Sequence, residues 1–353
     1  MISTALTRHL GITHPVVSAG MARVSQAELV LAVSQAGGMG CLGGVSFMPD
    51  RLGTEIEEIK AGTDRPYAVN LLLPESLTTE DEARWEPVRR LWASLSEQER
   101  RKLAGVEPLL TPGAVAKQVE VVLEAAPPVV VLTFATPAWF IEECRARGIL
   151  VFALVGSVGR AKEASRAGVD YIVAQGSEGG GHTGYASTLT LVPGVIEAVE
   201  QPVLAAGGIA DGRGLAAVLS LGAAGAWVGT RFIASCESYG HEAFKQRIID
   251  GHLNQTTLSR AYTGKPLRAF RNTWTEEWES KAEGISPFPQ QYAVAGTLVE
   301  TGYQDGDLER GMMPAGQAVE IIHEILPAGV IVENMVAEAE QILRRLVGSI
   351  ASG

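Results

Sequence analysis

A glycine-rich loop holds the residues best suited to chemistry in this sequence. Residues 176–184 read GSEGGGHTG, in which five glycines surround one imidazole, His182, and one carboxylate, Glu178. Glycine has no Cβ, so the backbone N–H groups of such a loop can approach a ligand closely. The loop follows an apolar run, which predicts that His182 lies at the carboxyl end of a strand as an acid–base group. Glu178 is a candidate either to orient His182 or to cap a backbone N–H.

Two more glycine-rich loops follow the next two apolar runs of the chain. They contain Gly207 with Gly208, and Gly229 with Thr230. In α/β barrels the loops after the seventh and eighth strands often bind a phosphate through backbone N–H groups. A tight turn whose Asp211 caps the next helix is the simpler interpretation, and we accept it for Asp211. For the paired loops we favour a phosphate, because two loops in the expected order agree.

Three other predicted strand ends offer groups that suit a flat ring. Asn70 and Gln175 carry amides that can pair with the edge of a heteroaromatic ring. Ala19, Gly20 and Met21 follow the first strand, and small residues there let a flat ring lie against the backbone. A flat ring together with a phosphate indicates a phosphorylated substrate or a cofactor such as FMN.

The elements that position these residues alternate between short apolar runs and amphipathic runs, which is typical of βα units. The expected strands are residues 15–19, 40–42, 67–72, 129–134, 150–155, 171–175, 202–206 and 224–228. Helices are expected over residues 25–35, 50–61, 138–147 and 161–167. Eight strands close a (β/α)8 TIM barrel of the α/β class. An open doubly wound sheet is the alternative, but the GxGxxG motif that would favour it is missing after the first strand.

The chain is expected to divide into a barrel and two additions. Residues 1–238 form the barrel, which carries a polar, partly helical insertion over 75–111 after the third strand. Residues 239–314 hold many aromatic side chains and are predicted to pack on the barrel rim, because aromatics are costly to leave in water. Residues 315–353 return to a helical pattern and form a C-terminal extension.

The motifs together resemble the nitronate monooxygenase (2-nitropropane dioxygenase) family of FMN-dependent barrels. The matching segments are residues 15–17, 19–22, 36–40, 69–70, 173–184, 205–212, 229–232 and 315–317. The resemblance implies FMN at the mouth of the barrel, and His182 matches the active-site histidine of the family. The implied cofactor contacts are Ala19, Gly20, Met21, Asn70, Gln175, Gly180, Gly181, Gly207, Gly208, Gly229, Thr230 and Gln317.

Family membership would make the chain an FMN-dependent oxidoreductase that converts alkyl nitronates and O2 into a carbonyl compound and nitrite. With a neutral nitroalkane, His182 would remove the α-proton; with a nitronate, it would chiefly bind the nitro oxygens. An NAD(P)H-driven reductase, of the enoyl-acyl-carrier-protein or quinone type, is the alternative on the same scaffold. A non-enzymatic FMN-binding barrel is the third hypothesis, and the intact His182 argues against it.

The net charge and the cysteine content indicate which partners and which environment to expect. The chain has 353 residues and a net charge of −11, which disfavours nucleic acid and anionic membranes as partners. Three widely spaced cysteines fit a reducing, cytoplasmic environment, with Cys41 and Cys144 expected in the core. No His, Cys and Asp cluster has the spacing of metal ligands, so no metal is expected. We expect a monomer or homodimer that acts on a small molecule and O2.

Overall fold

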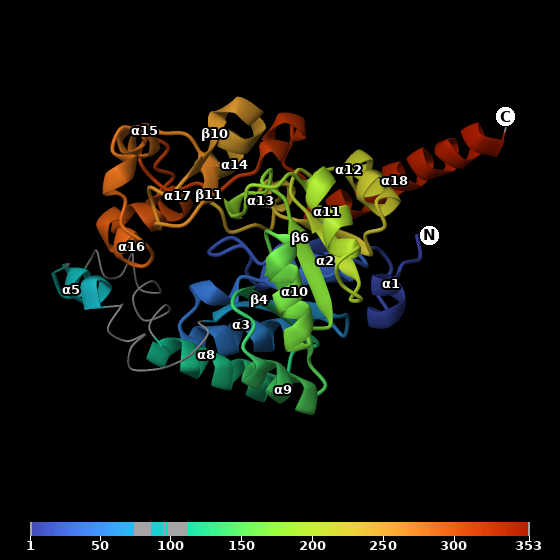
Figure 1. The fold of residues 1–353 in the computed structure, drawn as a ribbon, viewed down its shortest axis with the longest axis horizontal. Helices are drawn as coiled ribbons and strands as arrows, with labels where there is room; N and C mark the ends of the chain where they lie inside the picture. The colour runs from blue at the N-terminus through green and yellow to red at the C-terminus, as the bar shows by residue number, and fades with distance from the viewer. Residues whose placement is uncertain (1, 74–85, 95, 98–111, 352–353) are drawn as a thin grey trace.

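A parallel eight-stranded sheet forms the centre of the computed structural model, which describes residues 2–73, 86–94, 96–97 and 112–351 (Figure 1). The strands are β1 (Val16–Ser18), β2 (Gly40–Leu42), β3 (Tyr67–Leu73), β4 (Val129–Phe134), β5 (Leu150–Val155), β6 (Tyr171–Gln175), β8 (Val203–Ala206) and β9 (Gly225–Val228). All eight strands expected from the sequence are present, and each end lies within one residue of its predicted position. The predicted TIM-barrel class is therefore confirmed.

The sheet closes on itself through its two end strands. The strand order is β1-β9-β8-β6-β5-β4-β3-β2, so β1 and β2 are its two end strands. The backbone of Met39, just before β2, joins them: Ser18 N–H donates to its carbonyl oxygen and its own N–H donates to Val16, both at 3.0 Å. Closure leaves the strand ends as the two openings of the barrel.

Helices cover the outer face of the barrel because their apolar stripes need burial. They are α2 (Ala27–Gln35), α3 (Pro49–Gly62), α8 (Pro112–Ala125), α9 (Ala138–Ala146), α10 (Val158–Ala167), α11 (Thr188–Ile196) and α12 (Gly212–Ser220). On α8, for example, Val115, Val119 and Val122 recur at helical spacing and are buried against the sheet. Cys41 and Cys144 are buried in the apolar core of the barrel, as expected.

A short N-terminal helix closes the amino end of the barrel interior. Helix α1 (Ala5–Leu10) begins at Thr4, whose side chain takes part in a capping box with Thr7. Leu6 of this helix is fully buried among interior residues such as Phe152 and Tyr171. The carboxyl ends of the strands are therefore the end at which a ligand can enter.

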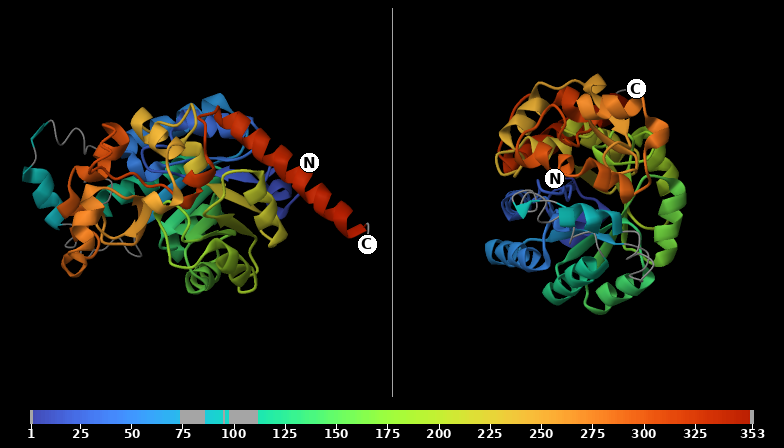
Figure 2. Two further views of the ribbon diagram at one scale, coloured as in Figure 1. Left: turned by 90° about the horizontal axis from the view of Figure 1, so that it is seen from above. Right: turned by 90° about the vertical axis from the view of Figure 1, so that its left-hand side faces the viewer.

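Residues after β9 build a layer over the carboxyl ends of the strands, which we call the rim extension (residues 239–314; Figures 1 and 2). It contains α14 (Glu242–Ile249), η2 (Leu253–Gln255), β10 (Thr256–Ser259), β11 (Leu267–Phe270), α15 (Thr273–Glu279), η3 (Ala282–Gly284), α16 (Gln290–Ala295) and α17 (Leu298–Gln304). Phe244, Tyr262 and Trp274 are buried in an apolar cluster that also includes barrel residues such as Val24 and Ile233. The extension also pairs with the barrel, because β11 is antiparallel to the two-residue strand β7 (Gly181–His182) in the histidine loop.

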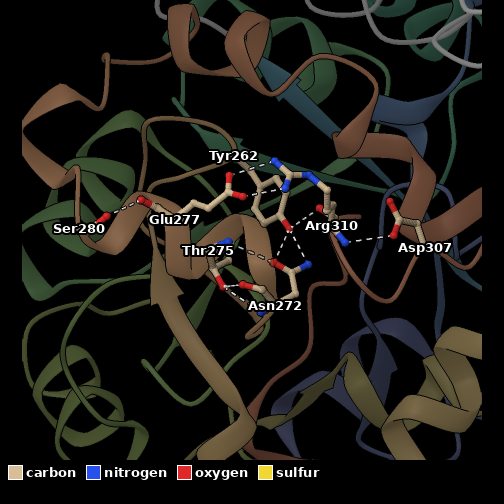
Figure 3. A network of polar contacts seen from close by, with 7 residues as sticks. All are labelled: Tyr262, Asn272, Thr275, Glu277, Ser280, Asp307 and Arg310. Atoms are coloured by element: carbon tan, nitrogen blue, oxygen red, sulfur yellow. Dashed lines mark hydrogen bonds and ion pairs between the residues drawn. The ribbon is translucent and has the colours of Figure 1, made fainter.

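A network of polar contacts fixes the centre of the rim extension (Figure 3). The hydroxyl of Tyr262 donates to the carbonyl oxygen of Arg310 at 2.9 Å and lies 2.9 Å from the amide nitrogen of Asn272. The guanidinium of Arg310 makes a two-pronged contact with the carboxylate of Glu277, at 2.8 and 3.0 Å. This network lies next in the chain to Thr263, which contacts His182.

Replacing Tyr262 with Phe is expected to lower the free energy of unfolding by about 1–2 kcal/mol, because a buried carbonyl and a buried amide lose their hydroxyl partner. Urea unfolding followed by circular dichroism measures the change. Tyr239→Phe is the matched control, since the Tyr239 side chain is 66% exposed. Equal stability of the two variants would show that the network does not hold the extension together.

The remaining elements lie at the two additions that the sequence predicts. Within the expected insertion, the structure describes α5 (Glu86–Ser94), beside α16, and residues 96–97; the rest of 75–111 lies outside the described residues. After the rim extension come η4 (Gln317–Ile321) and α18 (Ala328–Ala351), whose first half packs on the barrel and whose end projects away from it (Figure 1). Within the described ranges, neither α18 nor any other helix combines the length and apolar character that crossing a bilayer requires. The domain boundaries themselves stay a prediction.

Candidate active site

A cavity of about 270 Å³ lies between the carboxyl ends of the strands and the rim extension. His182 lines this cavity together with eleven of the twelve residues predicted to contact a cofactor. These eleven are Ala19, Gly20, Met21, Asn70, Gln175, Gly180, Gly181, Gly207, Gly208, Gly229 and Thr230. The twelfth, Gln317, lies outside the lining, where its backbone N–H donates to the carbonyl oxygen of Glu178 at 2.8 Å.

The loops after β8 and β9 present unused donors to the cavity. The backbone N–H groups of Gly208, Gly229 and Thr230 donate to none of the residues that the structure describes. The hydroxyl oxygen of Thr230 accepts from the N–H of Gly316 at 2.9 Å, which leaves its hydrogen available to a ligand. Clustered N–H and O–H donors without acceptors suit an anion such as a phosphate. The residues present therefore fit the phosphate group of FMN.

Glycine is required in the histidine loop because the backbone of residues 315–316 packs directly on it. A Cβ on Gly180 would lie 2.8 Å from the carbonyl carbon of Ala315 and 2.8 Å from the nitrogen of Gly316. A Cβ on Gly316 would lie 2.5 Å from the carbonyl oxygen of Glu178. A side chain at either position would push the loop out of place, and His182 with it.

Glu178 couples two of the cavity loops. Its carboxylate accepts from the backbone N–H of Thr188 at 2.9 and 3.1 Å, at the start of α11. The Thr188 hydroxyl lies 3.0 Å from both that carboxylate and the carbonyl oxygen of Gly207. Of the two roles expected for Glu178, capping a backbone N–H is confirmed, and its hydrogen bonds show no contact with His182. Glu178 thus fixes the loop after β8 relative to the histidine loop.

The two predicted amide residues use their nitrogens within the protein. Asn70 donates to the carbonyl oxygen of Val131 at 2.9 Å and to the Thr133 hydroxyl at 3.0 Å. Gln175 donates to the carbonyl oxygens of His182 at 3.0 Å and of Gly180 at 3.3 Å. Among the described residues neither amide oxygen accepts a hydrogen bond, so each remains available to an N–H on the edge of a ring.

The imidazole of His182 is held between the rim extension and the end of β4. Its Nε2 lies 3.0 Å from the hydroxyl oxygen of Thr263, and its ring meets that of Phe134 edge-on, with centroids 5.1 Å apart. The tautomer sets the direction of this bond: where the Thr263 hydroxyl donates to the carbonyl oxygen of Lys265, 3.3 Å away, its oxygen accepts from Nε2–H. Nδ1 is then the ring nitrogen free to take a proton.

Burial, and to a smaller extent the charge of Lys265, lowers the pKa of His182 to about 4. A desolvated imidazole next to a cation prefers its neutral form. His182 is therefore unprotonated at neutral pH, which is the state that a general base requires.

The lowered pKa of His182 should appear in the acidic part of the pH profile of kcat/KM. For a reaction in which His182 acts as the base, kcat/KM is expected to stay level as the pH falls from 7 to about 5 and to drop only as it approaches 4, because protonation removes the base form. Steady-state rates, measured in buffers of equal ionic strength, give this profile. An acid limb near 6.5, the value of an ordinary imidazole, would contradict this environment for His182.

The rim extension supplies cavity residues that carry no local signal in the sequence. Besides Thr263, it brings Tyr292, Glu300 and Tyr303 to the lining. The carboxylate of Glu300 is buried, and it accepts from the guanidinium of Arg23 in the β1–α2 loop at 2.8 Å. Burial raises the pKa of Glu300. These pairings join residues far apart in the chain, so neither periodicity nor spacing could have revealed them.

Comparison with known proteins finds one family along nearly the whole chain. A family model described as nitronate monooxygenase matches residues 3–338. A probable nitronate monooxygenase of Staphylococcus saprophyticus is 34% identical over 98% of this chain and 99% of the relative. FabK from Thermotoga maritima has a TM-score of 0.82 and 32% identity, covering 99% of this chain and 100% of its own. A nitroalkane oxidase from Streptomyces ansochromogenes has a TM-score of 0.81 and 31% identity, covering 97% and 100%.

Proposed function

Because the chain belongs to the nitronate monooxygenase family, we propose that it oxidises alkyl nitronates with O2 to a carbonyl compound and nitrite, using FMN. The observation that carries the proposal is the cavity that gathers His182 with the unused donors of the loops after β8 and β9. A base beside a phosphate site is the arrangement that a flavin enzyme acting on a small carbon acid needs.

Several residues would hold FMN in this cavity. Gly208, Gly229 and Thr230 would bind its phosphate, and the amide oxygens of Asn70 and Gln175 would accept from the edge of its ring. The chemistry that FMN supplies when bound is the acceptance of electrons from the substrate carbon and their transfer to O2.

The protein's own contribution is the control of a proton and of water. With a neutral nitroalkane, Nδ1 of His182 takes the α-proton, while Nε2–H stays bonded to Thr263 and fixes the ring. With a nitronate no proton has to be removed, and His182 serves to bind the nitro group. Trp227 and Met21 line the cavity with apolar surface, which excludes water from the reacting groups.

Oxygen consumption by the FMN-loaded protein tests the proposal. We expect uptake of O2 and release of nitrite with propionate 3-nitronate, and slower uptake with 2-nitropropane, which has to lose a proton first. An enzyme loaded with FMN that consumes no O2 with either compound would rule the proposal out.

NAD(P)H-driven reduction is the second candidate, and the likeness to FabK gives it some support. Anaerobic mixing with NADH and with NADPH separates the two reactions. Rapid bleaching of the flavin absorbance by either nucleotide would favour the reductase, whereas slow or absent bleaching, with rapid bleaching by a nitronate, would favour the monooxygenase.

A further inference from the structure

The outer half of helix α18 carries its apolar stripe beyond the edge of the barrel. On this face of the helix Ala339 is buried, and Ile342 and Leu343 are partly buried against the barrel. One turn further on, Leu346 is 49% exposed and Val347 is 68% exposed. Figures 1 and 2 show this end of α18 projecting past the barrel, near the amino terminus of the chain. The stripe that anchors the helix therefore continues into solvent.

The last turns of α18, residues 341–351, which we call the helix end, have a sequence poorly suited to a helix that stands alone in water. Val347 is β-branched, and Gly348 costs about 1 kcal/mol relative to alanine within a helix. Packing of an apolar face, rather than intrinsic preference, supplies most of the stability of helices in proteins. Leu346 and Val347 therefore mark a face that a partner would cover.

A groove of about 570 Å³ lies beside the helix end, at the amino end of the barrel. It is lined by residues 2–5, the start of β8, the end of α12 with the turn that follows it, and Leu343 of α18. Its walls are partly apolar, as at Pro202 and Leu219. Leu343 precedes Leu346 by one helical turn, so the groove and the exposed apolar face lie side by side on one molecule.

The groove and the helix end carry opposite charges. Glu200 lines the groove and is exposed, and no basic side chain of the described residues lies within 4.0 Å of its carboxylate. On the helix end Arg344 pairs with Glu340 at 3.1 Å, whereas Arg345 forms no ion pair within the part of the chain that the structure describes. The chain has 40 acidic and 29 basic residues, so a free arginine beside an uncovered apolar face suits an acidic protein surface such as its own.

We propose that two copies of this chain form a homodimer in which the helix end of each copy lies in the groove of the other. A two-fold axis brings the same surface of both copies together, so each complementary pair of patches is used twice. Leu346 and Val347 pack on the apolar wall of the groove, and Arg345 approaches Glu200 of the partner subunit. A standard interface takes about 20–30 residues from each partner. The groove supplies thirteen, and the helix end brings the total into this range.

The proposed interface lies at the opposite end of the barrel from the cavity of His182. The groove adjoins α1, which closes the amino end, whereas the cavity lies at the carboxyl ends of the strands. Dimer formation therefore leaves the cavity accessible, and a variant that is monomeric should keep its FMN content and its kcat/KM. Assembly and catalysis can thus be tested separately.

Sedimentation velocity of the full-length, FMN-loaded protein over a wide range of concentrations tests the dimer. The wild type should sediment at twice the mass of one chain. Leu346→Gln combined with Val347→Gln is expected to raise the dimer dissociation constant at least about tenfold, because the apolar contact is lost. Glutamine forms helices better than valine, so the circular dichroism should not change. Leu308→Gln is the matched control, since Leu308 is 48% exposed on the rim extension.

An exchange of charges tests how the helix end lies in the groove. Arg345→Glu should weaken the dimer about tenfold, because two carboxylates then face each other. Adding Glu200→Arg to the same chain should restore most of the affinity, since every copy then carries both exchanged charges. Glu197→Arg is the matched control: Glu197 is exposed but does not line the groove, so this change should not rescue Arg345→Glu.

Three results would overturn the proposal. The first is a wild-type protein that stays monomeric at every concentration. The second is a dimer that survives both glutamine substitutions, or one in which Glu200→Arg does not rescue Arg345→Glu, because its interface would lie elsewhere. The third is a monomer that sediments with vesicles of phosphatidylglycerol but not with vesicles of phosphatidylcholine, which would show that the helix end binds a membrane surface.

Discussion

Replacing His182 with Asn is expected to lower kcat/KM for a neutral nitroalkane by about 10²–10⁴-fold, the usual contribution of a positioned general base. Asn keeps a small, neutral polar side chain at this position, but it cannot accept the α-proton. The imidazole it replaces is neutral at pH 7 because burial lowers its pKa to about 4. Initial rates of O2 consumption with 2-nitropropane measure the effect.

The same variant carries its own control in the choice of substrate. A nitronate has already lost its proton, so the His182→Asn enzyme should oxidise propyl 1-nitronate within about tenfold of the wild-type rate, with unchanged FMN content. Turnover of the neutral nitroalkane that survives the substitution would show that another group is the base. Equal collapse with both substrates would mean that His182 chiefly binds the nitro group.

The second large effect is expected at the loop after β9. Gly229→Asp should raise the dissociation constant of FMN at least about a hundredfold, equivalent to roughly 3 kcal/mol, because a carboxylate would face the phosphate. The substitution should not disturb the fold itself. A Cβ at this position meets only Ala19 at 3.6 Å and the sulfur of Met21 at 3.7 Å, which is ordinary contact. Quenching of FMN fluorescence on titration with apoprotein gives the affinity.

Gly159→Asp provides the matched control for charge. Gly159 lies in the first turn of the exposed helix α10, where a Cβ meets nothing closer than the Ser157 hydroxyl at 4.0 Å. This variant should bind FMN like the wild type, and both variants should show the circular dichroism of the wild type. Normal affinity in Gly229→Asp would place the phosphate elsewhere in the cavity.

The barrel could be predicted from the sequence because its determinants are local. Each buried strand is a short apolar run, as in β6 (Tyr171–Gln175), and some helices begin with a local capping signal, as α12 does at Asp211. The cap predicted for Asp211 is confirmed, since its carboxylate accepts from the N–H groups of Arg213 and Gly214. Parallel strands must end at one side of a barrel, so the residues that follow them, including His182, were expected to meet there.

The rim extension could not be predicted in the same way, because its contacts join distant parts of the chain. In the pairing of β7 with β11, Leu267 lies opposite His182, and no sequence pattern within either segment predicts this pairing. For the same reason Thr263 and Lys265 escaped notice beside the histidine. Gln317 was expected at the cavity from a motif alone, whereas the structure uses its backbone to secure Glu178.

Because β7 pairs with β11, the orientation of the His182 imidazole depends on the rim extension as well as on the barrel. The walls of the cavity and the orientation of His182 therefore depend on the same segment, residues 239–314. Exchanging residues 239–314 between two relatives would replace part of the cavity lining and change the orientation of the histidine in one step. A substitution in the rim extension can thus change the shape of the cavity and the position of the base together, while the strands of the barrel keep their places.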